Sequence, residues 1–369
     1  MPKKGENIYK RKDGRWEGRI RHKDYNSGKG KRISVYGKTY SEVKRKMKLQ
    51  NAPTSLGSGG NICAIDMAKQ CDYWLENKKK QVKESTYQRY YAILEVHIKP
   101  WIKNNRQSCV GTDILVHFTD ELSKKSLAAG TAKNILSIFN SIIYYMADNG
   151  VIDTLPIKSS VPKEQKKPAR VLSAYEYEVL AKCLLKDITP IKLGILLSLE
   201  CGLRIGEICA MKSGSISVTQ RVLQVVSTIQ RLPCHDENVG GKTRLQLTSP
   251  KSLSSIRNIP LTVALCKICK KVISKNDEHY LLTDKERPME PRMLRYHLYK
   301  LCAECGLADV HFHTMRHTFA TRCIDAGVEV KSLSEILGHS DTRITMDCYI
   351  HPSFESKRAN LEKLKLTVY

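Results

Sequence analysis

The sequence predicts a multidomain, mainly α-helical protein, with an N-terminal three-stranded β-sheet plus helix, a helical domain and a mixed α+β domain. Three observations support this fold class. The chain has 369 residues, more than one ordinary domain holds. Segment 52–61 is rich in Gly and Ser, and segment 159–170 carries Pro and Lys, so both are expected to be linkers. Strand-like alternation before the first linker gives way to helical spacing after it. We therefore expect domains at 1–51, 62–158 and 171–369.

The first domain is expected to form a small sheet and one helix. Apolar residues alternate with polar and basic ones, which predicts strands at Asn7–Arg11, Arg15–His22 and Lys31–Tyr36. Thr39–Glu42 has the pattern of a capping box, so a helix is expected to follow and to reach about Gln50.

The sequence is strongly basic. It has 62 Lys and Arg against 37 Asp and Glu, a formal net charge of +25, and in the first 50 residues 17 basic against 5 acidic residues leave +12. This surplus indicates a polyanion partner, and DNA is favoured over an anionic membrane because no basic amphipathic helix has an aromatic face. In the first domain, Trp16, Arg19 and Arg21 are the candidates for DNA binding. The alternative is a solvated basic sheet.

The second domain is expected to be all-helical. Ser85–Gln88 has the pattern of a helix cap, and Thr131–Asn149 predicts the clearest helix, because its apolar residues share one stripe. No apolar run approaches the roughly 20 residues that span a bilayer, and Met1–Lys4 lacks an apolar signal core, so we expect no membrane segment and a cytoplasmic protein.

The third domain is expected to combine helices with a β-rich insert. Ser173–Glu176 is a capping box that begins the domain. Strands are predicted at Arg221–Leu232, Arg244–Thr248 and about Ile256–Ile259, with Lys251 in the turn before the last of them.

Short motifs in this domain carry residues suited to phosphate chemistry. Each alone is explained as readily by a surface ion pair or an interfacial aromatic, but together they form an ordered set. The candidates are, in chain order, Arg204, Lys251, His313, Arg316, His339 and Tyr349.

This order resembles the tyrosine recombinases, the phage-type integrase family, whose catalytic set runs Arg, Lys, His-x-x-Arg, His or Trp, and Tyr. The resemblance covers 171–369 as the catalytic domain and, more loosely, 62–158 as the core-site-binding domain. Segment 1–51 resembles the arm-site DNA-binding domain of phage and conjugative-transposon integrases. The resemblance implies a mobile-element recombinase that binds core and arm att sites on double-stranded DNA as a homotetramer, with accessory DNA-bending or excisionase proteins.

The resemblance also implies how the phosphate is held. Arg204 and Arg316 are expected to bind its non-bridging oxygens through their planar guanidinium groups, and so to stabilise the transition state. Glu207, one turn after Arg204, is expected to support the neighbouring basic groups. An ordinary helix-surface glutamate is an equal alternative.

The remaining candidates would move the protons and form the covalent bond. Tyr349 is expected to attack the phosphate, with His313 assisting as a base and His339 hydrogen-bonding the phosphate. Lys251 is expected to protonate the departing 5′-oxygen, which leaves a 3′-phosphotyrosine. Because that ester keeps the bond energy, neither ATP nor metal is expected, and the sequence has no GxxxxGK[ST] loop.

Two pairs of cysteines raise the question of a structural zinc site. They are separated by more residues than is usual, and they lie in apolar, helix-like segments, so packing in the core is favoured over metal binding. The cysteines concerned are Cys266, Cys269, Cys302 and Cys305.

Other functions share parts of this pattern. A type IB topoisomerase uses the same chemistry, a chromosome-resolving recombinase shares the catalytic domain, and a silent DNA-binding regulator could keep the fold. Segment Ser356–Leu366 predicts a short terminal helix, which would pack either on a neighbouring protomer or on its own domain.

Overall fold

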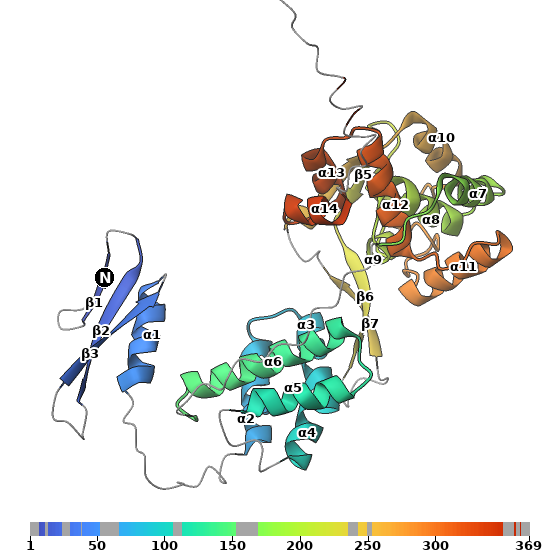
Figure 1. The fold of residues 1–369 in the computed structure, drawn as a ribbon. Coiled ribbons are helices and arrows are strands. Elements are labelled where there is room, and N and C mark those ends of the chain that lie inside the picture. Colours follow the sequence, from blue (N-terminus) through green and yellow to red (C-terminus); the bar gives the residue numbers. More distant parts are fainter. Residues whose placement is uncertain are drawn as a thin grey trace, which may run out of the picture. The chain divides into compact units, whose positions relative to one another are not determined.

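The computed structural model describes residues 7–11, 14–23, 30–37, 39–51, 66–105, 113–152, 169–234, 243–248, 253–349, 358 and 362. The chain forms two compact units, Met1–Gln165 and Lys166–Tyr369 (Figure 1). Most of the described residues are helical and a three-stranded sheet lies at the N-terminus, so the predicted fold class is confirmed. None of the helices described is both long and apolar enough to cross a membrane.

The first unit begins with an antiparallel sheet in the order β1-β2-β3. Its elements match the alternation and the capping signal of the sequence. They are β1 (Ile8–Lys10), β2 (Trp16–Lys23), β3 (Gly30–Gly37) and helix α1 (Tyr40–Asn51). The Thr39 hydroxyl caps α1 by accepting a hydrogen bond from the Glu42 amide at 3.2 Å.

Helix α1 covers one face of this sheet, and a small apolar core lies between them. Ile8, Val35 and Val43 are buried there. A Cβ on Gly18 would lie 2.6 Å from a Val43 methyl carbon, so a glycine at this point of β2 permits the close approach of the helix.

The rest of the first unit is helical and has its own core. Its elements are α2 (Met67–Lys79), α3 (Glu84–Ile93), a π-helical turn η2 (Leu94–Ile98), α4 (Lys99–Asn104), α5 (Ile114–Lys124) and α6 (Ala129–Asp148). The predicted stripe of the long helix is buried on α6: Ile135, Ile138, Phe139, Ile142, Ile143 and Met146. The prediction that Ser85 caps a helix was wrong, because α3 begins one residue earlier, after Lys83, and has no side-chain cap.

The second unit surrounds one large apolar core. Its helices are α7 (Ala174–Leu185), α8 (Pro190–Cys201), α9 (Ile205–Cys209), α10 (Val263–Val272), α11 (Pro291–Glu304), α12 (Phe312–Asp325), α13 (Val330–Leu337) and α14 (Thr342–Tyr349). The Ser173 hydroxyl and the Glu176 carboxylate form the predicted capping box of α7. Helix α8 is buried along most of its length, so the other helices pack around it.

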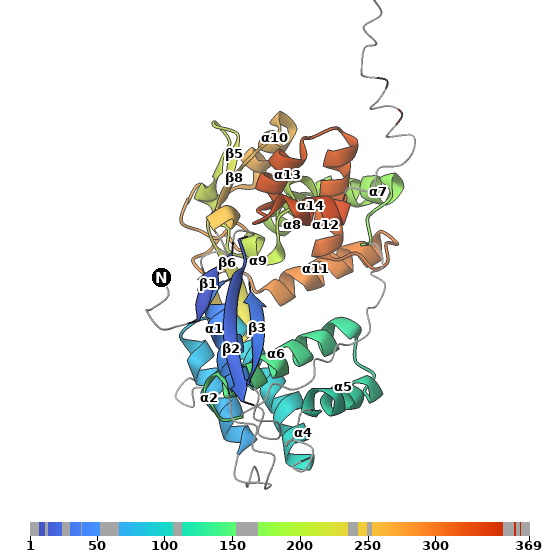
Figure 2. The ribbon, with the colours of Figure 1, turned by 60° about the vertical axis from the view of Figure 1, so that its left-hand side comes forward.

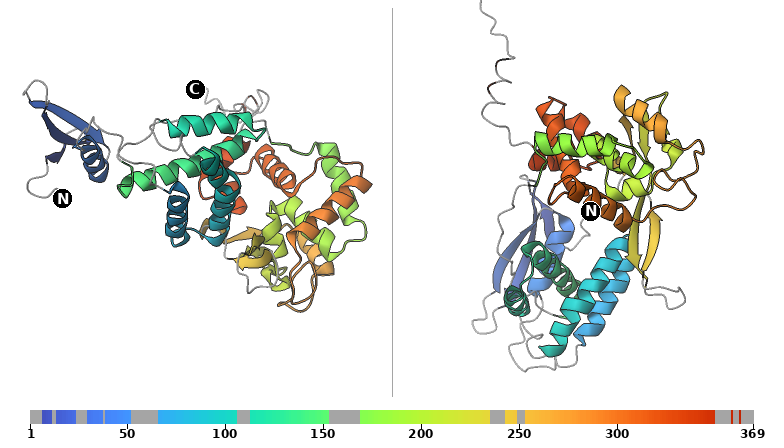
Figure 3. Two further views of the ribbon diagram at one scale, coloured as in Figure 1. Left: turned by 90° about the horizontal axis from the view of Figure 1, so that it is seen from below. Right: turned by 90° about the vertical axis from the view of Figure 1, so that its right-hand side faces the viewer.

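The β-rich insert of the second unit forms two small sheets. One contains β4 (Ile216–Ser217), β5 (Val222–Val225) and β8 (Arg257–Pro260), and the other contains β6 (Thr228–Pro233) and β7 (Thr243–Thr248). Strands β5 and β8 lie side by side near α10 (Figure 2), whereas the β6–β7 hairpin projects from the body of the unit (Figure 3). The single strand predicted at Arg221–Leu232 is therefore two strands, because its halves pair in different sheets.

Candidate active site

Arg204 lies at the sharp turn between α8 and α9. Helix α8 ends at Cys201, and Gly202 adopts a left-handed conformation, with φ of 65°, that residues with a side chain rarely take. The buried Ser198 hydroxyl donates to the Leu203 carbonyl at 3.0 Å and fixes the turn. The chain then enters α9 with Arg204 as its capping residue.

A buried carboxylate holds Arg204 in place. The backbone amide of Arg204 donates to one Glu207 oxygen at 2.9 Å, and its Nη1 donates to the other at 2.8 Å. Its Nη2 donates to the Gly338 carbonyl at 3.3 Å. Glu207 is only 3% exposed, whereas the Arg204 side chain is 34% exposed. Glu207 and the Gly338 carbonyl thus hold Arg204 on its buried side, while a third of its side chain remains exposed to solvent.

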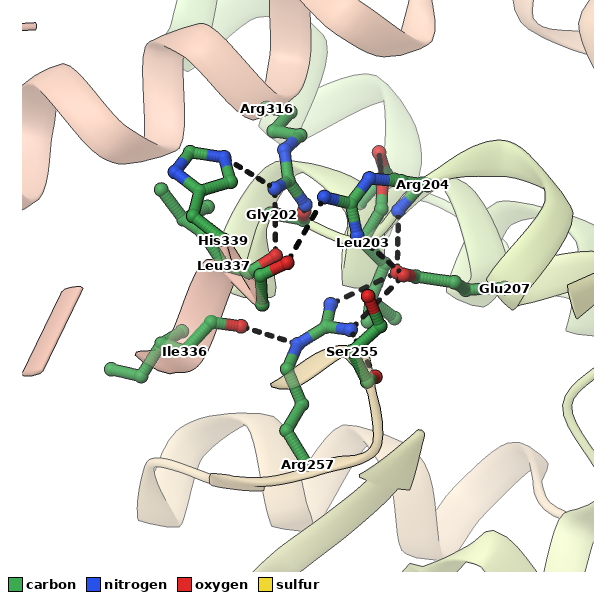
Figure 4. Close-up of polar contacts among 12 residues, drawn as sticks. Gly202, Leu203, Arg204, Glu207, Ser255, Arg257, Arg316, Ile336, Leu337 and His339 are labelled. Atoms are coloured by element: carbon green, nitrogen blue, oxygen red, sulfur yellow. Dashed lines mark hydrogen bonds and ion pairs between the residues drawn. The ribbon is translucent and has the colours of Figure 1, made fainter. Parts of the chain in front are cut away.

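Arg257 meets the same carboxylate from the opposite side. Its Nη1 and Nη2 donate to the two oxygens of Glu207 at 3.0 and 2.9 Å (Figure 4). Burial alone would raise the pKa of Glu207, but the hydrogen bonds and charge of Arg257, followed by Arg204, outweigh burial and lower this pKa below its ordinary value. Glu207 is therefore ionised and bridges two arginines.

Arg316, on α12, is held by the ends of two helices. Its Nη1 donates to the Gly202 carbonyl at the end of α8, and its Nη2 donates to the Leu337 carbonyl at the end of α13, both at 2.7 Å (Figure 4). The residue is 3% exposed. Helix C-termini carry partial negative charge, so these carbonyls offset part of the cost of burying the cation.

His339 follows α13 and contacts Arg316 directly. Arg316 Nη2 lies 2.9 Å from His339 Nε2, and because a guanidinium only donates, Nε2 must accept. The proton of the neutral ring is then on Nδ1, which donates to the Thr345 hydroxyl at 2.8 Å. Burial, followed by the charge of Arg316, lowers the pKa of His339 to about 4. His339 is therefore neutral near pH 7.

His313 lies one turn before His317 on α12, and the two ring centroids are 6.2 Å apart. Burial, followed by the charges of Arg316 and Arg204, lowers the pKa of His313 below its ordinary value. A neutral imidazole in this position is able to accept a proton at physiological pH.

The structure thus brings five of the seven catalytic and supporting residues proposed from the sequence into one neighbourhood. They are Arg204, Glu207, His313, Arg316 and His339. Lys251 lies outside the described residues. Tyr349 is the last residue of α14, its side chain lies outside the described part, and α14 packs on α12 and α13, which carry the other groups.

Sequence reasoning assigned no role to two residues of this network, Arg257 and Thr345. Arg257 did carry a signal, because it occupies the same face of its strand as the buried Ile259, where a charge needs a partner. Thr345 is fully buried, but only its contact with His339 reveals its role.

The paired cysteines lie on two helices of the core. Cys266 and Cys269 are buried on α10, and Cys302 is buried on α11. Cys305 has the Cys183 thiol as a near neighbour, and burial, followed by this contact, raises the pKa of Cys305 to about 12. Among the described residues no three His, Cys, Asp or Glu side chains gather as a metal site.

The outer face of the N-terminal sheet is organised by a buried carboxylate. Glu17 accepts hydrogen bonds from Arg11 and Arg19, both at 3.0 Å, and from the Ser34 hydroxyl at 3.2 Å. The hydrogen bond from Arg19 is the largest cause that lowers the pKa of Glu17 to about 2. The Arg19 guanidinium also lies 4.8 Å from the centre of the Tyr9 ring.

The three candidate DNA-binding residues of this sheet do not share one environment. Arg19 is exposed on the outer face. Trp16 lies on the helix-covered face, with its ring 5.4 Å from that of Tyr40, and packs against the small core. Core packing accounts for the position of Trp16, and its role in DNA binding stays a prediction. The backbone of Arg21 pairs with Arg32, but its side chain lies outside the described part.

Comparison with family models decides the relationship. The model described as "Phage integrase family" matches residues 170–356, half of the chain. The chain belongs to the phage integrase family. A second model of this kind, "Phage integrase, N-terminal SAM-like domain", matches residues 68–106 in the helical part of the first unit. Membership makes the protein a tyrosine recombinase, an enzyme that binds DNA and transfers its strands.

Relatives and solved structures agree with this family. A "Tyrosine recombinase XerC-like" protein of Caldanaerobacter subterraneus subsp. tengcongensis is 24% identical over 367 residues, 92% of each chain. The "Transposase from transposon Tn916" of Enterococcus faecalis is 26% identical over 190 residues, 46% of this chain and 44% of the relative.

Two solved structures share the fold. The Tn1549 transposon integrase in complex with a circular intermediate DNA matches with a TM-score of 0.65 and 21% identity, over 80% of this chain and 99% of that chain. A lambda integrase tetramer bound to a Holliday junction matches with a TM-score of 0.53 and 17% identity, over 91% and 96% of the two chains.

Proposed function

We propose that this family member is a site-specific recombinase of a mobile element, which cuts and rejoins DNA through a covalent phosphotyrosine at Tyr349. One observation carries the proposal. Arg204, Arg316 and His339 come from separate parts of the chain and meet in one hydrogen-bonded network. Relatives that are transposon transposases favour a mobile element over a topoisomerase or a silent regulator.

The two arginines supply the electrostatic part of catalysis. Attack on a phosphodiester places additional negative charge on the non-bridging oxygens. Arg204 lies at the start of α9 and Arg316 on α12, and we expect both guanidinium groups to bind the phosphate. Because both are held by hydrogen bonds before DNA binds, little reorganisation is needed in the transition state.

Tyr349 forms the covalent bond. Its hydroxyl oxygen bonds to phosphorus while the bond from phosphorus to the 5′-oxygen breaks, and the products are a 3′-phosphotyrosine and a 5′-hydroxyl. His313 takes the phenol proton, and Lys251 gives a proton to the departing 5′-oxygen. Attack by the 5′-hydroxyl of another strand reverses these steps and restores the tyrosine. The number of phosphoester bonds is unchanged, so the reaction draws on neither ATP nor metal.

His339 is proposed to donate a hydrogen bond to the scissile phosphate. Its Nε2 accepts a hydrogen bond from Arg316 in the structure without DNA. Donation to a phosphate oxygen needs a proton on Nε2, so we propose that DNA binding exchanges the Arg316 contact for a phosphate contact. The proton then leaves Nδ1, and the Thr345 hydroxyl, which accepts from Nδ1 before DNA binds, donates to it afterwards and keeps the ring in position.

The proposed assembly is a homotetramer on DNA, with segment 62–158 on core sites and segment 1–51 on arm sites. Accessory DNA-bending or excisionase proteins belong to the same proposal. The net charge of +25 and the exposed Arg11 and Arg19 of the N-terminal sheet support the DNA-binding part of this proposal. Replacing Arg19 by Gln should weaken binding to arm-site duplexes and reduce the salt slope of the affinity by about 1. Replacing the exposed Lys182 of α7 should leave both unchanged.

The function is tested by incubating the protein, without metal or ATP, with a nicked duplex. The duplex spans the joined ends of the mobile element that encodes this protein. The expected result is a denaturant-stable protein–DNA adduct. Tyr349→Phe should abolish the adduct, whereas Tyr175→Phe, which alters an exposed tyrosine of α7, should leave it intact. Tight binding of this duplex by the wild-type protein without any adduct would contradict the proposal.

A further inference from the structure

Arg257 is a buried cation with four hydrogen bonds. It is 8% exposed and lies at the start of β8. Two bonds go to Glu207, at 3.0 and 2.9 Å, one goes to the Ile336 carbonyl at 2.5 Å, and one goes to the Ser255 carbonyl at 3.1 Å (Figure 4).

These bonds join parts of the chain that each carry an active-site group. Through Glu207, Arg257 is one step from Arg204, because the same carboxylate oxygen accepts from both guanidinium groups. Through the Ile336 carbonyl, it holds the last turn of α13, which leads into His339.

Gly338 completes the contact between Arg257 and this turn. A Cβ at Gly338 would lie 3.1 Å from both Cδ and Nη1 of Arg257, and its φ of 67° is itself in the left-handed region. The turn before His339 is therefore packed directly on the Arg257 side chain.

Stability alone does not account for a buried ion pair in this position. Such a pair is often no more stable than well-packed apolar residues of similar size, because both charges lose their water. We infer that the pair sets the position of the Arg204 guanidinium. Arg257 competes with Arg204 for the oxygens of Glu207, and this competition limits how far Glu207 draws Arg204 toward the core.

We propose that Arg257 is a positioning residue of strand cleavage, which aims Arg204 at the scissile phosphate through Glu207 and fixes the turn that carries His339. This inference rests on the proposed function. Without Arg257, both oxygens of Glu207 become available to the Arg204 guanidinium, which in the structure bonds only one of them, and the guanidinium that should face the phosphate is drawn inward.

The test separates positioning from simple loss of structure by changing the charge of the substrate. The first substrate is the nicked duplex described above. The second has one non-bridging oxygen of the scissile phosphate replaced by methyl, so that this group carries no charge and depends less on Arg204. The variants are Arg257→Met, Arg257→Lys and, as a control for destabilisation in the same strand, Ile259→Ala, which removes buried methyl groups from β8.

Arg257→Met should slow adduct formation about 100-fold on the charged phosphate, the loss typical of one preorganised donor, and less than about tenfold on the neutral one. Arg257→Lys should show the same pattern to a smaller degree, and it is the variant to compare if Arg257→Met does not fold. Ile259→Ala should slow both substrates by the same factor.

Equal losses on the two substrates for the Arg257 variants, or losses no larger than that of Ile259→Ala, would overturn the inference while leaving the proposed function intact. Failure of the wild-type protein to form the Tyr349 adduct would instead overturn the proposed function itself.

Discussion

The contact between Arg316 and His339 predicts how the stability of the second unit depends on pH. His339 Nε2 accepts a hydrogen bond from Arg316 at 2.9 Å, so a proton on Nε2 would remove this bond and bring two cations together. The folded-state pKa of about 4 lies below the ordinary value near 6.5. The unfolded chain therefore binds a proton more readily than the folded one, and stability present above about pH 6.5 is lost as the pH falls toward about 4.

The size of this loss follows from the two pKa values. Between about pH 7.5 and about pH 5, linkage gives a loss of about 2 kcal/mol for His339 alone, and solvent screening reduces this to about 1–2 kcal/mol. A loss of 1 kcal/mol lowers the melting temperature of a domain of this size by about 2–4 °C. The second unit should therefore melt roughly 2–8 °C lower at about pH 5 because of this one group.

Replacement of His339 by Gln isolates the effect. The amide oxygen of glutamine keeps an acceptor for Arg316 but does not titrate, so the variant should lose less stability on acidification than the wild-type protein. His313 and His317, whose pKa values are also lowered, are present in both proteins and cancel in the comparison.

Differential scanning calorimetry measures the transition of the second unit. All three tryptophans of the chain lie in the first unit, so tryptophan fluorescence reports that unit separately and serves as an internal reference. If the melting temperatures of the wild type and of His339→Gln fall by the same amount between the two pH values, the His339 ring does not accept from Arg316 and the reasoning fails.

Two further predictions concern the same network. Glu207→Gln removes the charge that compensates buried Arg257 and should destabilise the second unit by about 3–5 kcal/mol in calorimetry, whereas Glu178→Gln, at an exposed pair, should cost less than about 1 kcal/mol. Gly338→Ala and Gly327→Ala both place a side chain at positive φ, but only at Gly338 does the new carbon meet Arg257. Gly338→Ala should therefore lower both melting temperature and adduct formation further than Gly327→Ala, and equal effects would contradict the packing described above.

The sequence was sufficient for features that depend on local periodicity and order. The apolar stripe of α6 is buried as its spacing predicted, and the capping box at Ser173 begins α7. The ordered set of arginines and histidines also anticipated which groups meet, because its resemblance to a family carries information about tertiary structure that single motifs lack.

Other features depended on contacts that no local pattern encodes. The pairing of Arg257 with Glu207 joins residues 50 positions apart, so only the folded chain reveals it. The break between β5 and β6 arises because each strand has a different partner. That Trp16 and Arg19 face opposite sides of β2 follows from the sequence alone, since they are three residues apart in one strand.

The two arginines proposed as catalytic differ in how easily a substitution elsewhere in the chain displaces them. Arg316 is held by the carbonyls of Gly202 and Leu337, which are backbone groups and not side chains. Arg204 has one backbone contact, with the Gly338 carbonyl at 3.3 Å, and depends for its ion pair on the side chain of Glu207, which a single codon change removes. As an element diverges in its hosts, Glu207 is therefore where we expect inactive copies to arise by one substitution that spares every group contacting DNA.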